Sequence, residues 1–471
     1  MADASIFADS ISISTPNGIQ LSPSIILSSP LAIPQGVKYI YSQLAANANE
    51  LDEGVANILL SLISDGNKLS QGYCDTLISS LTSIVSECST WLVSSGHIDD
   101  PFSTISSTVL ANVLPQMRDG NEVLHLAVGS IPIEDEMRID SSFNTLFVLS
   151  RSLVDTPSSS ARFRAHFVSK LSKPPPALLI GLPGEYSSSQ APAILLSPST
   201  TEKSPLTVAL FAGASEAALE ELVNLIECGV PALILEDSCE LCSLLHSGWL
   251  LTRSSHFSPH SFSSWIESSL ESIFTENEDT LQSVNSLVNR FFSSSLSDQP
   301  LIEFINKSHL SDLPSRILHL TSLTSSSLQQ SRILITASKL NCPSILSSLS
   351  PDFDDAQLLE SLLAECTSRD SRIDFLSSLL SHSINTPITS SLLIRMLNSN
   401  DKHFFCTVVL PLLGYASPPT VITEEFTLVI DEFIYSIVGI HGMFPSLSDS
   451  NTFSYSLLSI WSLLLHRPHL V

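Results

Sequence analysis

Hydrophobic positions fall into short runs broken by polar turns most regularly between residues 206 and 245. An apolar run at 206–211 (LTVALF) is followed by a small-residue turn (AGAS), a helix-length stretch (EAALEELVNLIECG) and a second apolar run that starts at Val230 (VPALILE). Apolar runs of this length, bounded by turn residues, are typical of buried strands. The segment therefore predicts one βαβ unit of a parallel sheet.

The same pattern extends back to Tyr39. Helices are expected at 53–64 and 75–88. Strands are expected at 91–93, 123–128, 177–182, 206–211 and 232–236. Strands that alternate with helix-length or loop-length connections predict a mostly parallel, Rossmann-like α/β domain over residues 39–250.

Three other stretches in this half of the chain lack a clear period. Residues 1–38 alternate Ile, Ser and Pro, and we interpret them as a lead-in segment, loosely packed or strand-forming, with no assigned role. Residues 158–164 and 186–205 are rich in Ser and Pro, which disfavours regular ladders. We expect both to be surface loops.

Beyond Trp249 the apolar residues recur at helical spacing. In 354–366 (DDAQLLESLLAEC) four leucines share one helical face, and similar segments follow at 371–381 and 390–398. Helices this short are unstable alone, so we expect them to stack pairwise. The pattern predicts an all-α, solenoid-like helical domain over residues 251–471.

Composition and charge narrow the classes of function. The chain is serine-rich and acidic, with a formal net charge of −26 that disfavours nucleic acid and anionic membrane surfaces as partners. The N-terminus has no signal-peptide pattern, and the apolar runs stop near ten residues, so we expect a cytoplasmic chain without a membrane span. The pair Cys239 and Cys242 has no second pair at zinc-ribbon spacing, and we expect reduced, mostly buried thiols.

Three turn motifs carry a resemblance to a known family. TWLVSSGH (90–97) is similar to a tryptophan-led strand with a Gly-Gly-Thr turn, and FAGAS (211–215) is similar to a strand that ends in Glu-Gly-Gly. VPALILEDSCE (230–240) is similar to a Val-Pro-Val-Val-Val strand with an acidic Gly-Ser-Gly-Arg turn. In this order they resemble the SLOG-type (LSDAT) domain in the cytosolic N-terminal region of melastatin-type transient receptor potential (TRP) channels.

The helical half is collinear with the same family. Residues 371–398 resemble its Asp-Phe-Val segment with two apolar helices, and residues 458–471 (LSIWSLLLHRPHLV) resemble the Phe-Ile-Trp-Ala-Val helix that precedes the membrane domain. The resemblance covers residues 39–471. It implies a regulatory and assembly region of a cation channel, without a pore in this chain, that packs in a homo-oligomer or against channel subunits and meets the membrane only indirectly.

The resemblance also implies where an effector would bind. No cofactor is required, but a nucleotide-type, ADP-ribose-like effector would contact the family's three turns. The residues at these turns are Ser94, Ser95, Gly96, His97, Ala212, Gly213, Ser215, Glu236, Ser238 and Glu240.

Several residues in these turns depart from the family pattern. Ser95 and Asp100 replace glycines of the first turn, and Asp237 and Cys239 replace glycines of the third. A side chain at such a position blocks close approach of the backbone to a phosphate. Glu240 stands where the family has an arginine, which inverts the charge that attracts phosphate. We therefore expect a degenerate nucleotide site.

A simpler interpretation needs no ligand. The turns are then tight strand-to-helix connections in which Ser94, Ser95, Ser215 and Ser238 are helix N-caps. The remaining functional alternative is a free-standing, protein-binding scaffold.

An enzymatic function has less support. The phosphoribohydrolases that SLOG-type domains resemble need a glutamate where this chain has Leu219, and Glu220 comes one residue late. His256 with His260, and His466 with His469, flank prolines that interrupt the helix a metal pair would need. We expect no enzyme activity, no catalytic residues and no metal site.

Overall fold

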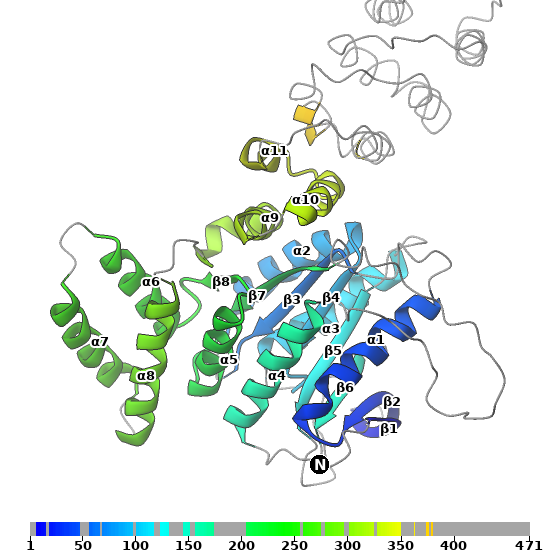
Figure 1. The fold of residues 1–471 in the computed structure, drawn as a ribbon, viewed down its shortest axis with the longest axis horizontal. Coiled ribbons are helices and arrows are strands. Elements are labelled where there is room, and N and C mark those ends of the chain that lie inside the picture. Colours follow the sequence, from blue (N-terminus) through cyan, green and yellow to red (C-terminus); the bar gives the residue numbers. More distant parts are fainter. Residues whose placement is uncertain are drawn as a thin grey trace, which may run out of the picture. The chain divides into compact units, whose positions relative to one another are not determined.

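The computed structural model (Figure 1) describes most of the first three quarters of the chain. The described residues are 6–15, 18–47, 56–65, 68–97, 100–116, 123–130, 145–150, 156–173, 204–254, 258–274, 278–295, 301–324 and 327–349, with isolated residues at 362, 374, 375, 378 and 379. The chain divides into two compact units, Met1–Gln329 and Gln330–Val471.

Within these residues, unit 1 contains a nine-stranded sheet in the order β1-β2-β6-β5-β4-β3-β7-β8-β9. The strands are β1 (Ile6–Thr15), β2 (Gly18–Leu27), β3 (Ile58–Ile63), β4 (Thr90–Ser94), β5 (Val123–Ser130), β6 (Thr145–Ser150), β7 (Leu206–Phe211), β8 (Ala232–Leu235) and β9 (Ile302–Ile305). β1 and β2 form an antiparallel hairpin, and every other neighbouring pair is parallel.

The sheet is wound in two directions from its middle. β3, β4, β5 and β6 succeed one another toward one edge, and β7, β8 and β9 succeed one another toward the other. The neighbours β3 and β7 therefore lead into connections that run to opposite edges, and the sheet has its topological switch point between them. Ile63 and Phe211 are register partners, so both strands end at the same level.

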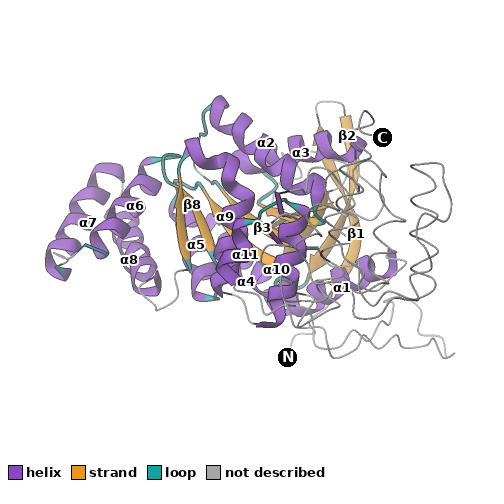
Figure 2. Ribbon diagram, turned by 90° about the horizontal axis from the view of Figure 1, so that it is seen from above, coloured by secondary structure: helices purple, strands orange, loops and turns teal. Residues whose placement is uncertain are grey.

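Helices cover both faces of the sheet. α2 and α3 lie on one face, and α1, α4 and α5 lie on the other (Figure 2), while α6, α7 and α8 pack on one another on the β8 side. The α-helices are α1 (Ile33–Asn47), α2 (Gln71–Glu87), α3 (Pro101–Val113), α4 (Pro157–Leu171), α5 (Glu216–Glu227), α6 (Glu240–Thr252), α7 (Pro259–Ile273), α8 (Glu278–Ser295), α9 (Leu313–Thr324), α10 (Ser327–Lys339) and α11 (Ser344–Leu349). The 3-10 helices are η1 (Pro30–Ala32), η2 (Leu114–Gln116) and η4 (Lys307–Asp312).

The two-sided covering explains the sequence of the central strands. Every residue of β3, β4, β7 and β8 is buried, and strands buried on both faces have continuous rather than alternating apolar runs. Trp91 of β4 packs edge-on against Tyr41 of α1 with ring centroids 5.2 Å apart. The Tyr41 hydroxyl donates to the carbonyl of Leu171 at 2.7 Å, which ties α1 to the end of α4.

Four predicted strands and two predicted helices are confirmed. The segments at 91–93, 123–128, 206–211 and 232–236 correspond to β4, β5, β7 and β8. The helix at 75–88 corresponds to α2, and the helix-length stretch EAALEELVNLIECG corresponds to α5. The Rossmann-like α/β class is therefore correct for unit 1. The strand expected at 177–182 and the loop expected at 186–205 lie outside the described residues.

Two local predictions are wrong. The helix expected at 53–64 is β3, whose ILLSLI run is buried on both faces in the middle of the sheet. The loop expected at 158–164 is the first half of α4, because Thr156 and Ser159 form a capping box that starts this helix ahead of its serine-rich first turn.

The expected domain boundaries are also corrected. Residues 1–38 are not separate from the α/β domain, because β1 and β2 extend its sheet and α1 begins at Ile33. The α/β domain does not end at residue 250, because β9 pairs with β8. The division between compact units falls after Gln329.

Only the start of unit 2 is described. α11 lies within it, and Asn341, with φ of 51°, accepts a hydrogen bond from the Phe375 N–H at 2.9 Å. The segments 354–366, 371–381 and 390–398 fall almost wholly outside the described residues. No helix in the described part of the chain is both long enough and apolar enough to cross a membrane.

Candidate functional site

The ten predicted ligand residues share one placement, at the carboxyl ends of strands near the switch point. They are Ser94, which ends β4, with Ser95, Gly96 and His97 after it; Ala212, Gly213 and Ser215, between β7 and α5; and Glu236, Ser238 and Glu240, from the end of β8 into α6. Because β3 lies between β4 and β7, its own turn enters the middle of this group. The structure thus adds Ser64 and Asp65 to the site.

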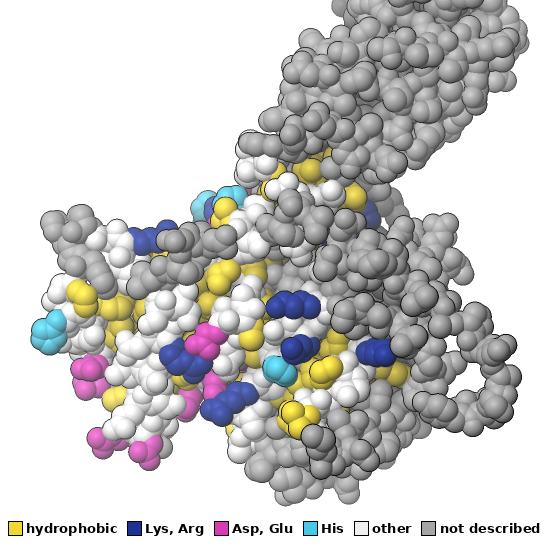
Figure 3. Space-filling view, in the orientation of Figure 1, with side chains coloured by type: hydrophobic (Ala, Val, Ile, Leu, Met, Phe, Trp, Pro, Cys, Tyr) yellow, Lys and Arg dark blue, Asp and Glu magenta, His cyan; other side chains and the backbone are white. Residues whose placement is uncertain are grey.

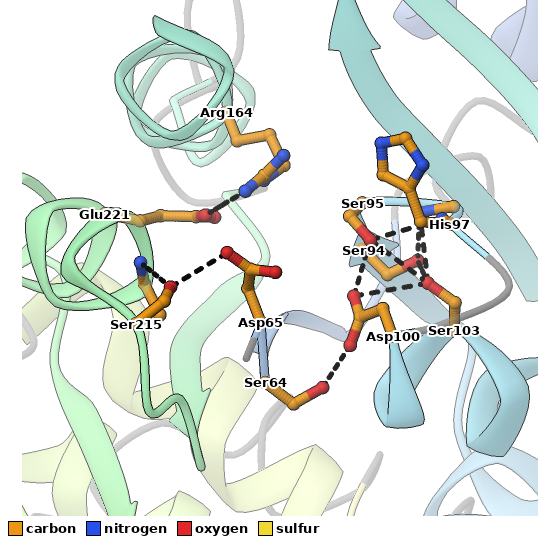
Figure 4. A network of polar contacts seen from close by, with 12 residues as sticks. Ser64, Asp65, Ser94, Ser95, His97, Asp100, Ser103, Arg164, Ser215 and Glu221 are labelled. Carbon is orange, nitrogen blue, oxygen red and sulfur yellow. Dashed lines mark hydrogen bonds and ion pairs between the residues drawn. The ribbon is translucent and has the colours of Figure 1, made fainter. Parts of the chain in front are cut away.

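Asp100 joins the β3 turn to the β4 turn. Its carboxylate caps α3 by accepting from the Phe102 N–H at 3.2 Å, and it also accepts from the hydroxyls of Ser64 and Ser95, the latter at 2.5 Å. Figure 4 shows this carboxylate between the two serines. Asp100 is only 6% exposed, so its negative charge is held inside the site by groups of the chain itself.

A second cluster closes the β4 turn. Gly96 has φ of 76°, in the left-handed region that favours glycine. Its N–H donates to the Ser103 hydroxyl at 3.1 Å, and the His97 N–H donates to the Ser95 hydroxyl at 3.2 Å. These N–H groups, which would face a phosphate in a nucleotide-binding turn, already have side-chain acceptors.

Ser94 connects this cluster to His125 of β5. The Ser94 oxygen accepts from the Ser103 hydroxyl at 3.2 Å and lies 2.8 Å from Nε2 of His125. Burial lowers the pKa of His125 to about 4. A serine and a neutral histidine at this distance are the parts of a nucleophilic pair, but both are 1% exposed and out of reach of a substrate.

Asp65 joins the β3 turn to the β7 turn. Its carboxylate accepts from the Ser215 hydroxyl at 2.8 Å, and its carbonyl accepts from the Ala214 N–H at 3.0 Å. Ser215 also accepts from the Ala218 N–H at 3.1 Å and so caps α5. The start of α5 is thereby fixed to the end of β3.

A buried ion pair lies beside these turns. Arg164 of α4 and Glu221 of α5 meet at 2.8 Å, with side chains 8% and 2% exposed (Figure 4). Burial has the largest effect on the Arg164 pKa and lowers it, but Glu221, Asp100 and Asp65 together raise that pKa above its ordinary value. Burial, with Asp100 and Asp65, also raises the Glu221 pKa against the opposing effect of Arg164. Three carboxylates therefore act on one guanidinium, and Glu221 is the one in contact with it.

Gly213 is retained for packing rather than for ligand approach. A Cβ built at Gly213 would lie 2.3 Å from the Ala218 Cβ, so only glycine lets the β7 turn lie this close to α5. Its carbonyl accepts from the Cys239 thiol at 3.3 Å, which links the β7 turn to the start of α6.

The carboxylates of the third turn have partners within the chain or are exposed. Glu236 pairs with His246 of α6 at 2.9 Å, and Glu240 is exposed at the start of that helix. Asp237 accepts from the Tyr73 hydroxyl at 2.9 Å and from the Lys307 N–H at 3.2 Å. Each carboxylate is thus either paired within the chain or turned to solvent.

One of the four predicted N-caps is confirmed. Ser215 caps α5, but the N-cap of α3 is Asp100 rather than Ser94 or Ser95. The N-cap of α6 is Cys239 rather than Ser238, whose hydroxyl donates to the Leu235 carbonyl at 2.7 Å. These predictions were wrong because the turns are longer than expected, which moves the cap of α3 five residues beyond Ser95 and the cap of α6 one residue beyond Ser238.

The chemical capacity of the arrangement follows from these contacts. An anion at the switch point would meet Asp65 and Asp100, while the N–H groups of Gly96, Phe102 and Ala218 already have acceptors. Within the residues described, no three His, Cys, Asp or Glu side chains are arranged to hold a metal ion. The face in Figure 3 adds acidic side chains over α7 and the start of α8, where Glu267, Glu271, Glu278 and Asp279 are exposed.

Comparison with known proteins finds a longer relative of this chain. No family model matches the sequence. The chain is 40% identical to Protein ced-11 of Caenorhabditis elegans over 487 aligned residues, which cover 96% of this chain and 33% of that protein. The chain thus spans about a third of the length of this curated relative.

Proposed function

We propose that this chain is a cytoplasmic regulatory and assembly region, resembling that of melastatin-type TRP cation channels, whose nucleotide-sensing turns have become structural. One observation carries the proposal. The carboxylate of Asp100 is buried at the switch point and held by Ser64, Ser95 and the Phe102 N–H, in the region where doubly wound folds bind their ligands.

Electrostatics argues in the same direction. A nucleotide phosphate would need to approach Asp65 and Asp100 in a site where Arg164 is already paired with Glu221. Breaking that buried pair would leave Glu221 without its counter-charge, which costs roughly 3–5 kcal/mol. Binding in the family's manner is therefore unfavourable, and ADP-ribose-like effectors are not ligands of this site in our proposal.

The assembly role is supported by the similarity to a longer protein and by the order of segments along the chain. The similarity to Protein ced-11 covers nearly all of this chain but a third of that protein, and the order of segments resembles a region that packs between channel subunits. In our proposal, residues 330–471 form the solenoid-like helical part, and the partners are other copies of the chain or channel subunits rather than nucleic acid.

Calorimetric titration of the 471-residue chain with ADP-ribose tests the sensing part of the proposal. We expect no saturable binding up to millimolar ligand, either by the wild type or by Glu240→Arg, because the N–H groups of the turns stay paired in both. A Glu221→Gln variant, in which Arg164 loses its charged partner, should also fail to bind, because Asp65 and Asp100 remain in the site. Saturable binding by the wild type that Glu240→Arg strengthens would overturn the proposal.

The assembly part has its own measurement. Sedimentation velocity of the chain over a hundred-fold range of concentration should show self-association. A chain that remains monomeric throughout, and that shows no binding to purified channel subunits of the same organism, would contradict the assembly role.

A further inference from the structure

Cys239 and Cys242 lie at the start of α6, directly after the carboxyl end of β8. Cys239 is the N-cap of the helix, with extended backbone angles (φ −160°, ψ 170°), and its sulfur accepts from the Cys242 N–H at 3.4 Å. The two residues are one helical turn apart, a Cα separation of roughly 5 Å for that spacing. That separation is within the range that a disulfide bridges.

The two sulfurs approach the same atom. Cys239 Sγ lies 3.3 Å and Cys242 Sγ 3.9 Å from the carbonyl oxygen of Gly213. The sulfurs therefore lie on the same side of the turn. All six cysteines in the described residues are free thiols, so this pair is reduced in the structure.

The pair is asymmetric in exposure and acidity. Cys239 is partly exposed and Cys242 is buried. A hydrogen bond from Cys242 is the largest cause that brings the Cys239 pKa down to about 7. Burial opposes it and raises this pKa, while the helix N–H groups of Cys242 and Leu241 and the Ser238 hydroxyl lower it further. Burial raises the Cys242 pKa well above its ordinary value. The outer sulfur is the better nucleophile at neutral pH.

Other titratable groups lie near the pair, on the preceding turn and on α2 and η4. Glu236 and Asp237 lie on the turn before Cys239, and Asp237 raises the Cys242 pKa. From α2, Tyr73 donates to Asp237, and burial followed by that bond raises the Tyr73 pKa so that it stays protonated. From η4, the Lys307 N–H also donates to Asp237 and partly offsets its charge.

We propose that Cys239 and Cys242 form a thiol–disulfide exchange site whose substrates are small-molecule disulfides of the glutathione disulfide type. The Cys239 thiolate attacks one sulfur of the substrate, the substrate S–S bond breaks, and one substrate thiolate leaves. Cys242 then loses its proton to solvent and attacks Cys239 in the mixed disulfide, and the second substrate thiolate leaves. Two protein thiols are oxidised to one disulfide, and one substrate disulfide is reduced to two thiols.

This site does not depend on the proposed regulatory function. Its reacting atoms are the sulfurs of Cys239 and Cys242 at the start of α6, whereas the degenerate nucleotide site centres on Asp65 and Asp100. Failure of one proposal leaves the other standing.

The test is incubation of the full chain with mixtures of reduced and oxidised glutathione at pH 7, followed by acid quench, alkylation and peptide mapping by mass spectrometry. In the wild type we expect a Cys239–Cys242 disulfide to form with increasing oxidised glutathione. We expect Cys239 to be alkylated about ten-fold faster than Cys228, an exposed cysteine that follows α5. Because the peptide mapping of the wild type requires no substitution, it tests the proposal even if a variant does not fold.

Single variants separate the two roles. Cys242→Ser should stop the reaction at a stable glutathione adduct on Cys239, Cys239→Ser should leave Cys242 unmodified, and Cys228→Ser should behave as the wild type. The proposal is overturned if the wild type retains a glutathione adduct on Cys239 without an internal disulfide. It is equally overturned if both thiols stay reduced while Cys228 reacts.

Discussion

Ser215 donates a 2.8 Å hydrogen bond to the carboxylate of Asp65, a residue 150 positions earlier in the sequence. The same serine oxygen accepts from the Ala218 N–H, so it caps α5 and joins the two strands of the switch point at once. The hydrogen bond links the β3 and β7 turns at the place where doubly wound folds bind their ligands. This link should contribute to stability, and its contribution can be measured.

Ser215→Ala should destabilise unit 1 by about 1–2 kcal/mol, because it removes a helix cap and leaves the Asp65 carboxylate without this donor. Denaturant unfolding followed by tryptophan fluorescence measures the change. Ser263→Ala is the matched control, since Ser263 is exposed on α7 and donates within its own helix to the Pro259 carbonyl. Equal midpoints for the two variants would show that the Asp65 contact contributes nothing.

The two arginine–glutamate pairs between α4 and α5 should differ in their contributions. Arg164→Met leaves Glu221 charged in a buried site and should cost roughly 3–5 kcal/mol. Arg162→Met should cost less, roughly 1–2 kcal/mol, because the Arg162 side chain is 70% exposed, although that of its partner Glu220 is only 6% exposed. The double variant Arg164→Met with Glu221→Leu should recover much of the loss. A double variant as unstable as Arg164→Met alone would contradict this account.

Acid should destabilise unit 1 through His125. Its pKa is about 4 when folded, below the ordinary value of 6.5, so the unfolded chain binds more protons between these values. The stabilisation is fully present above pH 6.5 and is lost as the pH falls toward 4, by roughly 2 kcal/mol between pH 7 and pH 5. The free energy of unfolding is measured at both pH values in the wild type and in His125→Gln. The difference between the two proteins in its pH dependence is the contribution of His125. An identical pH dependence in the two proteins would refute it.

Gly213→Ala should destabilise the β7 turn by about 1–3 kcal/mol, because the new Cβ would overlap Ala218 and the turn would have to move away from α5. Gly129→Ala on β5 is the control, since a Cβ there meets no atom within 4 Å. Thermal unfolding of both variants gives the comparison. Similar loss in both would mean that strand propensity, not the close approach, sets the cost.

Where the sequence signal was local, the fold could be predicted. β7, α5 and β8 follow from an apolar run, a capping serine and a second run within thirty residues, and Ser215 acts as predicted. The prediction of a helix where β3 lies was wrong, because an apolar run of six residues fits a buried strand or a buried helix equally well until its neighbours are known. β9 was not predicted, because it has only four residues and is separated from β8 by three helices.

The site shows the same limit. Asp100 stood out as a departure from a glycine pattern, but its partner Ser64 directly follows β3 and lies in the segment 53–64 that was predicted to be a helix. His125 and Arg164 had no sequence signal, because each owes its role to a partner distant in the chain, Ser94 and Glu221. A serine, aspartate and glycine directly after an apolar run, as at 64–66, would have been the signal for the missing turn.

The late position of β9 has a consequence for synthesis. β8 gains its outer partner only after α6, α7 and α8 have been made, which takes several seconds at about 5–20 residues per second on the ribosome. During that time the outer edge of β8 presents unpaired N–H and C=O groups to other nascent chains and to chaperones. A recombinant fragment cut at residue 250 would keep this edge open permanently, so a fragment for expression should extend beyond residue 305.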